Sequence, residues 1–236
     1  MLRLLRTVSL IAVALFSVAT TAQEQYQEGV HYELIEPTVH TGISDKVVVS
    51  EFFSYGCGHC FNFEPLLESF EARLPEGVVV QRIPVIWNNN AGMKLLAKTY
   101  YAAQILDVLD PVHGAMFNAI HRHRKRIATP EAVRAVFVDS GVDGKKFDRA
   151  FKSFGTDSMV RQAAARTEGA RINGTPSLMV NGKYRIDTRQ AGGQANMLKI
   201  AAFLADKELA RMKQGSERRR ISARRLSISR VGSLFG

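Results

Sequence analysis

The sequence predicts an α/β fold in which one sheet is built from both ends of the chain, with an all-helical segment inserted between its two parts. Three observations predict this architecture. A strand, helix, strand pattern covers residues 46–85, helical patterns continue from about 93 to 167, and a further strand and hairpin cover residues 176–186. The 236 residues, 46% of them hydrophobic, are enough to bury such a core.

The first part of the sheet is predicted from two strand patterns. Residues 46–53 form a run of β-branched and aromatic side chains, which is typical of a buried strand, and residues 78–85 form a second one. Between them, apolar residues recur at three- and four-residue steps, as in an amphipathic helix. They are Phe63, Leu66, Leu67, Phe70 and Leu74. Strand, helix and strand in this order favour a parallel pair with a right-handed crossover.

The rest of the chain predicts helices and then a hairpin. Thr129 and Pro130 mark a helix start within the helical segment, because threonine caps a helix and proline suits its first turn. After the next strand, Asn181 and Gly182 give a strong signal for a tight hairpin turn. A last amphipathic helix is predicted for residues 193–212.

The first 22 residues have the layout of a cleavable secretory signal. Arg3 and Arg6 precede an apolar run at 8–18, and small residues at 20–22 offer a cleavage site. The run is shorter than the roughly 20 residues that a membrane-spanning helix needs, so an uncleaved membrane anchor is the less favoured alternative. Export of the mature chain predicts a periplasmic location, which is an oxidising compartment.

Together these patterns divide the chain into four parts. They are a signal peptide at 1–22, a sheet domain made of 23–87 and 168–213, an inserted helical domain at 88–167, and a basic tail at 214–236. The formal net charge of +10 is concentrated at the C-terminal end, since residues 211–236 hold eight Lys or Arg and one acid. Residues 23–210 carry only +1, so a nucleic-acid partner is not expected.

The basic tail alternates arginines with serines and few apolar residues. A disordered end is the favoured interpretation, because apolar residues are sparse, and weak contact with an anionic lipid surface is the alternative. A second basic run, residues 121–126, contains His121 and His123. Two residues apart on a helix, these histidines face different directions, so a solvated helix end is favoured over a metal or anion site.

The chain has only two cysteines, Cys57 and Cys60, and both lie between the first predicted strand and the first helix. Three positions apart, they cannot join distant parts of the fold. A CxxC segment in this context is typical of redox chemistry. A zinc site would need a second pair of ligands, and a c-type haem site would need histidine where Phe61 stands. A plain structural disulfide would not require this order of strand and helix. No metal or other cofactor is therefore expected.

Disulfide exchange needs one exposed thiol that is deprotonated near neutral pH. Cys57 would lie at the start of the helix, where unpaired backbone N–H groups and the helix dipole stabilise an anion. His59 could add charge or a hydrogen bond to the same thiolate and lower its pKa below the usual value of about 8.5. Cys60, one helical turn further on, would be more buried and would act as the resolving thiol.

Thr175 and Pro176 stand just before the third predicted strand. Such a proline can simply begin an edge strand. The functional alternative is a cis peptide bond, which is essentially confined to X-Pro bonds. A cis turn would bring the Thr175 backbone beside Cys57 and leave polar groups to pair with an extended client chain.

Two segments of the chain resemble the DsbA family of periplasmic disulfide oxidants, which is part of the thioredoxin superfamily. Residues 51–64, which contain the CxxC, are similar to the family's active-site segment. Residues 173–184 are similar to its cis-proline strand and hairpin, and the resemblance extends over about 47–212. It implies a thioredoxin fold with an inserted all-helical domain.

The same resemblance implies roles for individual residues. Cys57 would be the nucleophile, Cys60 its partner and Pro176 the cis-proline. Glu51, six residues before Cys57, matches an acidic residue beneath the family's active site that assists proton movement to the buried thiol. A carboxylate inside an apolar strand should have a raised pKa. The alternative is that Glu51 faces solvent, because a strand alternates its faces.

The function that the resemblance implies is that of a monomeric dithiol oxidase. It would introduce disulfide bonds into exported proteins with reduced cysteines and be reoxidised by a membrane protein of DsbB type. Gly58 and Thr175 stand where the best-known members have proline and valine, which keeps a disulfide isomerase or reductase as the alternative. Residues 23–46 are too few for the dimerisation domain of such isomerases. A non-redox peptide-binding module is the third hypothesis.

Overall fold

The computed structural model describes residues 25–232 of the chain, and the side chains of residues 25–222. The predicted signal peptide, 1–22, lies outside the described residues and stays a prediction. Within the described range, no helix combines the length and the apolar character needed to cross a membrane.

Among the described residues, a five-stranded sheet forms the centre of the molecule, in the order β1, β5, β4, β2, β3. The strands are β1 (Glu33–Leu34), β2 (Val47–Phe53), β3 (Val78–Pro84), β4 (Ser177–Val180) and β5 (Tyr184–Asp187). β2 and β3 are parallel, whereas every other neighbouring pair is antiparallel. The prediction that both ends of the chain build one sheet is therefore confirmed.

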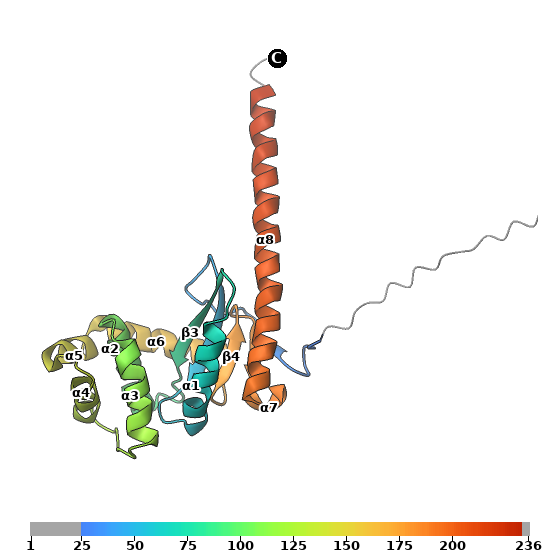
Figure 1. Ribbon diagram of the computed structural model, residues 1–236. Coiled ribbons are helices and arrows are strands. Elements are labelled where there is room, and N and C mark those ends of the chain that lie inside the picture. The colour runs from blue at the N-terminus through green and yellow to red at the C-terminus, as the bar shows by residue number, and fades with distance from the viewer. Residues whose placement is uncertain (1–24, 233–236) are drawn as a thin grey trace, which may run out of the picture.

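The helices form two groups. Figure 1 shows one group as a lobe beside the sheet and the other as helices packed on the sheet. The lobe consists of α2 (Ala91–Ile105), α3 (Leu109–His121), α4 (Pro130–Asp139), α5 (Gly144–Phe151) and α6 (Phe154–Gly169). The others are α1 (Gly58–Glu71), the short α7 (Thr188–Ala191) and α8 (Gln194–Gly232). α2 and α6 contact β3, while α8 contacts α1, β2, β4 and β5. The inserted helical segment is thus present in the fold.

Two hydrophobic cores hold these layers together. One joins the sheet to the helical lobe and includes Phe52 and Phe117, and the other joins the sheet to α1 and α8 and includes Val49 and Leu204. All seven residues of β2 are buried. A strand covered on both faces has no solvent side, which explains why its sequence is a nearly continuous apolar run.

The hairpin between β4 and β5 turns at the predicted residues. Asn181 and Gly182 both have positive φ angles, of 53° and 69°. A Cβ atom at Gly182 would overlap the carbonyl oxygen of Val39, so only glycine fits there. This close approach fixes the register that places Ser177 opposite Asp187 at the other end of the hairpin.

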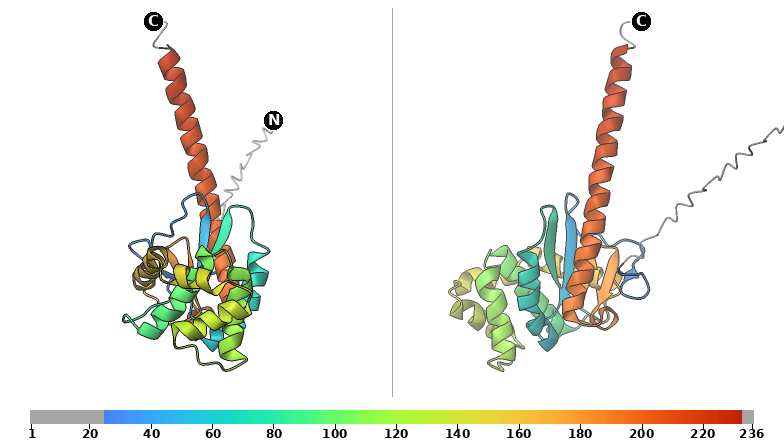
Figure 2. Two further views of the ribbon diagram at one scale, coloured as in Figure 1. Left: turned by 90° about the vertical axis from the view of Figure 1, so that its left-hand side faces the viewer. Right: turned by 45° about the vertical axis from the view of Figure 1, so that its right-hand side comes forward.

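α8 is longer than the sequence predicts. The expected helix ends at 212 and is followed by a disordered tail, whereas α8 continues to Gly232. Its first part packs on the sheet through buried side chains such as Met197 and Ile200, and its later part runs on beyond the sheet as a straight rod (Figure 2). Once a helix is nucleated, each further residue adds a hydrogen bond, so the packed part can support the continuation.

Candidate active site

Cys57 lies between the end of β2 and the start of α1, as predicted. It is the N-cap residue of α1, and its Sγ accepts a hydrogen bond from the Cys60 backbone N–H at 3.3 Å. The same sulfur lies 3.4 Å from the carbonyl oxygen of Thr175. Cys57 is half-buried and both cysteines are free thiols. The first turn of α1 and the loop before β4 therefore meet at this sulfur.

The pKa of Cys57 is lowered to about 5. A hydrogen bond with the Cys60 side chain makes the largest contribution to this shift. Burial acts in the opposite direction, and further hydrogen bonds from Thr175 and from the Cys60 and His59 backbones help to outweigh it. Cys57 is therefore a thiolate at neutral pH, which is the form that takes part in exchange.

Cys60 has the opposite character. It is completely buried, and burial, together with the neighbouring Cys57 sulfur, raises the pKa of its thiol well above the usual value. Two thiols of one short segment thus have pKa values shifted in opposite directions. Only Cys57 is both accessible and ionised, as the positions of the two cysteines on the helix predict.

Glu51 is buried in β2, with no exposed surface. Neither of its carboxylate oxygens has a hydrogen-bond partner among the described residues. Its pKa is raised well above the usual value by burial and by the nearby Glu64, and the attraction of Arg82 only partly opposes this. The Arg82 Nε lies 3.7 Å from the Glu51 Oε2. Glu51 is therefore a buried acid that holds its proton at pH values where most carboxyl groups are ionised.

A cluster of charged and polar groups surrounds Glu51, and the sequence does not predict it. Arg82 on β3 pairs with Glu64 at 3.5 Å and with Glu71 at 3.1 Å, both from α1. The Glu64 Oε1 lies 3.2 Å from the His113 Nε2, and the His113 Nδ1 lies 2.8 Å from the Tyr55 hydroxyl. Ionisable groups from β3, α1 and α3 thus connect the interior beneath the cysteines to the helical lobe.

The histidine contacts differ from those that the sequence predicts. The His59 side chain is exposed, and the contribution of His59 to the low pKa of Cys57 comes from its backbone. His121 lies at the site instead of in solvent: its Nε2 is 2.8 Å from the Tyr55 carbonyl oxygen, and its ring stacks on Phe61 at 5.2 Å between centroids. A Cβ on Gly58 would lie 3.9 Å from the same ring.

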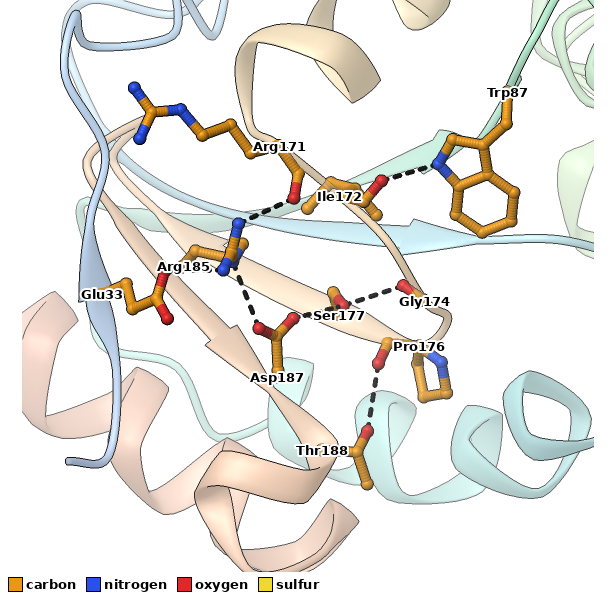
Figure 3. A network of polar contacts seen from close by, with 10 residues as sticks. All are labelled: Glu33, Trp87, Arg171, Ile172, Gly174, Pro176, Ser177, Arg185, Asp187 and Thr188. Carbon is orange, nitrogen blue, oxygen red and sulfur yellow. Dashed lines mark hydrogen bonds and ion pairs between the residues drawn. The ribbon is translucent and has the colours of Figure 1, made fainter. Parts of the chain in front are cut away.

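The peptide bond between Thr175 and Pro176 is cis, as predicted. Figure 3 shows how hydroxyl groups hold the loop on both sides of Thr175. Ser177 donates a hydrogen bond to the Gly174 carbonyl at 2.9 Å, and Thr188 donates one to the Pro176 carbonyl at 3.0 Å. The carbonyls flanking Thr175 are therefore engaged inside the protein, and that of Thr175 points to Cys57.

An ion-pair network supports this loop from behind (Figure 3). The Ser177 Oγ lies 3.1 Å from Asp187 Oδ1, and Asp187 pairs with the buried Arg185 at 3.2 Å. Arg185 also donates to the Arg171 carbonyl at 2.7 Å and pairs with Glu33 at 2.6 Å. The loop and this network line an open cavity of about 600 Å³. β1 and β5 thus fix the backbone that faces Cys57.

The CxxC lies at the first turn of a helix and faces a cis-proline just before a neighbouring strand of a thioredoxin-type sheet. This arrangement defines the class of thiol-disulfide oxidoreductases. Residues 72–205 match the model of the DSBA-like thioredoxin domain family. The chain is 38% identical over 199 residues to the thiol:disulfide interchange protein DsbA of Bordetella parapertussis, covering 84% of this chain and 92% of that protein. It therefore belongs to the DsbA family of thioredoxin-fold thiol-disulfide oxidoreductases.

Further relatives agree with this assignment. The thiol:disulfide interchange protein DsbA of Pseudomonas aeruginosa is 34% identical over 218 residues, which cover 91% of this chain and all of that protein. The crystal structure of Pseudomonas aeruginosa DsbA superposes with a TM-score of 0.75 at 33% identity, covering 80% of this chain and 97% of that one. Members of the family act through their own redox-active cysteine pair without a cofactor. Within residues 25–232, no group of three or more His, Cys, Asp or Glu is placed to hold a metal ion.

Proposed function

We propose that the chain is a periplasmic thiol-disulfide oxidase that introduces disulfide bonds into exported proteins through its Cys57-Gly58-His59-Cys60 segment. The observation that carries this proposal is the low pKa of Cys57, about 5, beside a buried Cys60 whose pKa is raised. A stabilised Cys57 thiolate stabilises the reduced form of the pair. The disulfide form is then a strong oxidant.

The proposed reaction transfers two electrons from a client to the cysteine pair. A client thiolate attacks the Cys57 sulfur of the Cys57–Cys60 disulfide, which breaks that bond, forms a mixed disulfide and releases the Cys60 sulfur. A second client thiolate then attacks the client sulfur of the mixed disulfide and releases Cys57 as a thiolate. The client leaves with a disulfide, and Cys57 and Cys60 are left reduced.

Client binding is assigned to the loop at Thr175 and Pro176. Because the Gly174 and Pro176 carbonyls accept hydrogen bonds within the protein, the Thr175 backbone, whose carbonyl faces the Cys57 sulfur, is the part of the loop positioned to pair with an extended client. Clients are exported proteins that still carry reduced cysteines. A membrane protein of DsbB type would return the pair to its oxidised form, as the family resemblance implies.

Glu51 is proposed to supply the proton that Cys60 takes up when it leaves the disulfide. Its carboxyl group is buried and has a raised pKa, and its charge contributes to the raised pKa of Cys60. An acid whose pKa is raised by burial can protonate a leaving thiolate that burial disfavours. Arg82 limits how far the Glu51 pKa can rise, because a nearby cation favours the ionised form.

The reduction potential of the Cys57–Cys60 pair tests the proposed function. In glutathione buffers we expect a potential less negative than about −180 mV, which lies on the oxidising side of the isomerase range. Thiol trapping of the protein in intact cells should find the pair mostly as a disulfide. A pair that is mostly reduced in the cell would instead support the isomerase or reductase hypothesis.

Replacing Glu51 with glutamine tests the proposed proton donor. Glu51→Gln should slow oxidation of a reduced client peptide by about tenfold or more, because glutamine cannot deliver a proton. The pH profile of that rate should also lose the limb that reports a carboxyl group with a raised pKa. Stopped-flow measurement between acid and alkaline pH gives both quantities.

The matched control for that variant is Glu71→Gln. Glu71 pairs with the same arginine at 3.1 Å, but its side chain is 43% exposed, whereas that of Glu51 is completely buried. The control should keep the rate and the carboxyl limb of the pH profile, which should move only slightly to lower pH because the Glu71 charge makes the smallest of the contributions to the Glu51 pKa. A Glu51→Gln protein that oxidises the peptide at the unchanged rate would show that the proton comes from another group or from water.

A further inference from the structure

α8 consists of a packed part and a basic extension. In the packed part, the buried Glu208 binds the Lys183 ammonium at 2.6 Å, the Asn181 side chain at 2.7 Å and the Tyr184 hydroxyl at 3.2 Å. This group of contacts fixes the helix to the β4–β5 hairpin. Residues 213–232, which we name the basic extension, follow directly and continue past the sheet (Figure 1).

The basic extension carries a large excess of positive charge. Its sequence holds seven Lys or Arg and a single acid, Glu217, whereas residues 23–210 together carry only +1. The described residues Lys213, Arg218 and Arg220 are exposed. Almost all of the excess charge of the mature chain therefore lies on one helix that projects from a nearly neutral body.

The redox domain does not account for this helix. The family model ends at residue 205, before the basic extension begins. The crystal structure of Pseudomonas aeruginosa DsbA is matched over 97% of its own length by only 80% of this chain. Residues 213–232 thus lie outside the matched family model, and the positive charge on them needs an explanation outside the redox chemistry.

The extension points away from the active site. At the start of α8, the Gln194 side chain donates a hydrogen bond to the His59 carbonyl at 2.8 Å, so this end of the helix lies beside the two cysteines. At a rise of about 1.5 Å per residue, Gly232 lies about 57 Å further along the helix axis. The Cys57 sulfur therefore lies near the opposite end of α8 from the basic extension, which projects beyond the sheet (Figure 2).

We infer that the basic extension docks on an anionic lipid bilayer and so keeps the redox domain at the membrane surface. Clusters of Lys and Arg are drawn to the negative surface of such bilayers, and each added cation strengthens the attraction. The extension also carries Ile221, Leu226 and Ile228 among its arginines, and apolar residues of this kind favour a lipid interface over a nucleic-acid partner. The inference rests on the exported location under the proposed function, and not on the redox chemistry.

Cosedimentation of the full mature chain with lipid vesicles tests the inference. We expect binding to vesicles of phosphatidylglycerol and phosphatidylethanolamine, and little binding to vesicles of phosphatidylcholine alone. Because the attraction is electrostatic, it should be largely lost at about 0.5 M salt, where the screening length is only a few ångströms. Equal binding to both kinds of vesicle would overturn the inference.

Charge reversal gives the sharper comparison. The triple variant Arg220→Glu, Arg224→Glu and Arg225→Glu brings the extension to zero net charge, and we expect its partition coefficient on anionic vesicles to fall by at least about tenfold. The matched control replaces the same three arginines with lysine and should bind like the natural chain. Unchanged binding of the glutamate variant, or tighter binding of the natural chain to duplex DNA than to anionic vesicles, would refute lipid docking.

Redox activity is measured in parallel so that the two proposals can fail separately. The glutamate variant should oxidise a soluble reduced peptide at the natural rate, which also shows that it is folded. Anionic vesicles should leave the rate of the natural chain unchanged, because Cys57 lies beside the opposite end of α8 from the docked extension. Vesicles that block peptide oxidation would show that the chain binds lipid through its active site and not through the extension, whereas a Cys57→Ser chain should still bind them.

Discussion

Replacing Cys57 with serine is expected to reduce the oxidation of client peptides by about a thousandfold or more. Cys57 is the one thiol of the pair that is both accessible and ionised, since its pKa is about 5 while Cys60 is completely buried. A serine hydroxyl cannot form a disulfide, so neither the mixed disulfide nor the enzyme's own disulfide can form. Stopped-flow oxidation of a dithiol peptide by the purified oxidised protein measures the loss.

Replacing Cys60 with serine should have a different consequence. Cys57 keeps its thiolate and can attack a client disulfide, releasing one client thiolate and forming a mixed disulfide. Because the neighbouring thiol that would resolve it is missing, the mixed disulfide should accumulate and be visible by mass spectrometry or on a non-reducing gel. Multiple turnovers by Cys60→Ser, or trapped client on Cys57→Ser, would contradict the assigned order of the two cysteines.

The second large effect concerns the stability of the reduced protein as the pH changes. The pKa of Cys57 is about 5 in the folded protein and about 8.5 in an unfolded chain. A group whose folded pKa is lowered binds fewer protons in the folded state, so folding becomes more favourable as the pH rises between the two values. The stability that the Cys57 thiolate contributes should therefore be complete above about pH 8.5 and be lost as the pH falls through about 5.

Two other groups near the site have raised pKa values and act in the opposite direction. Cys60 keeps its proton in the folded state. The stability that this thiol contributes is therefore lost only as the pH rises above about 8.5, its pKa in the unfolded chain. Glu51 also keeps its proton, which costs stability as the pH rises above about 4.3, but it is present in both redox forms. Comparing the reduced with the oxidised protein therefore removes most of the Glu51 contribution, although the Cys57 thiolate adds to the raised pKa of Glu51 in the reduced form.

We expect the melting temperature of the reduced protein, relative to that of the oxidised protein, to rise steadily between about pH 5 and pH 8.5. Thermal unfolding of both forms across this range, followed by circular dichroism, measures the difference. The Cys57→Ser protein, which has no disulfide form, supplies the control, since its melting temperature relative to that of the oxidised natural protein should lack this rise. A difference that stays constant over the range would show that the pKa of Cys57 is not lowered.

Much of the fold follows from local patterns in the sequence. The run at 46–53 becomes β2 because both of its faces are covered, and the apolar spacing after the cysteines becomes α1. The hairpin turns at Asn181 and Gly182 because both adopt positive φ. Thr129 caps α4 with its side chain, as predicted. In each case the residues that form the structure are neighbours in sequence.

The groups beneath the active site could not be predicted in the same way. Glu64 and His113 are 49 residues apart in the chain, and each has an ordinary place on a helix in the sequence. Only the packing of α3 against α1 brings the two within 3.2 Å. The same reason explains why the place of His121 is not predicted. The local pattern assigns His121 to a solvated helix end, whereas tertiary packing places its ring against Phe61. Contacts between distant elements leave no periodic signal.

The basic tail shows a second reason why local sequence does not always predict structure. Sparse apolar residues favour disorder when a segment is considered alone. α8 nevertheless continues through it, because Glu208 and the residues before it attach the helix to the hairpin and so supply the nucleus. The behaviour of a segment can thus be set by the element that it extends.

The space around Gly58 bears on how this enzyme could be tuned. Gly58 is the first residue of α1, a position that accepts proline readily. The nearest group that an added side-chain carbon would meet is the His121 ring, at an ordinary contact distance of 3.9 Å. Neither the backbone conformation nor the packing therefore requires glycine at position 58. A different residue at this position would thus stand directly beside the Cys57 thiolate while the scaffold around it stays the same.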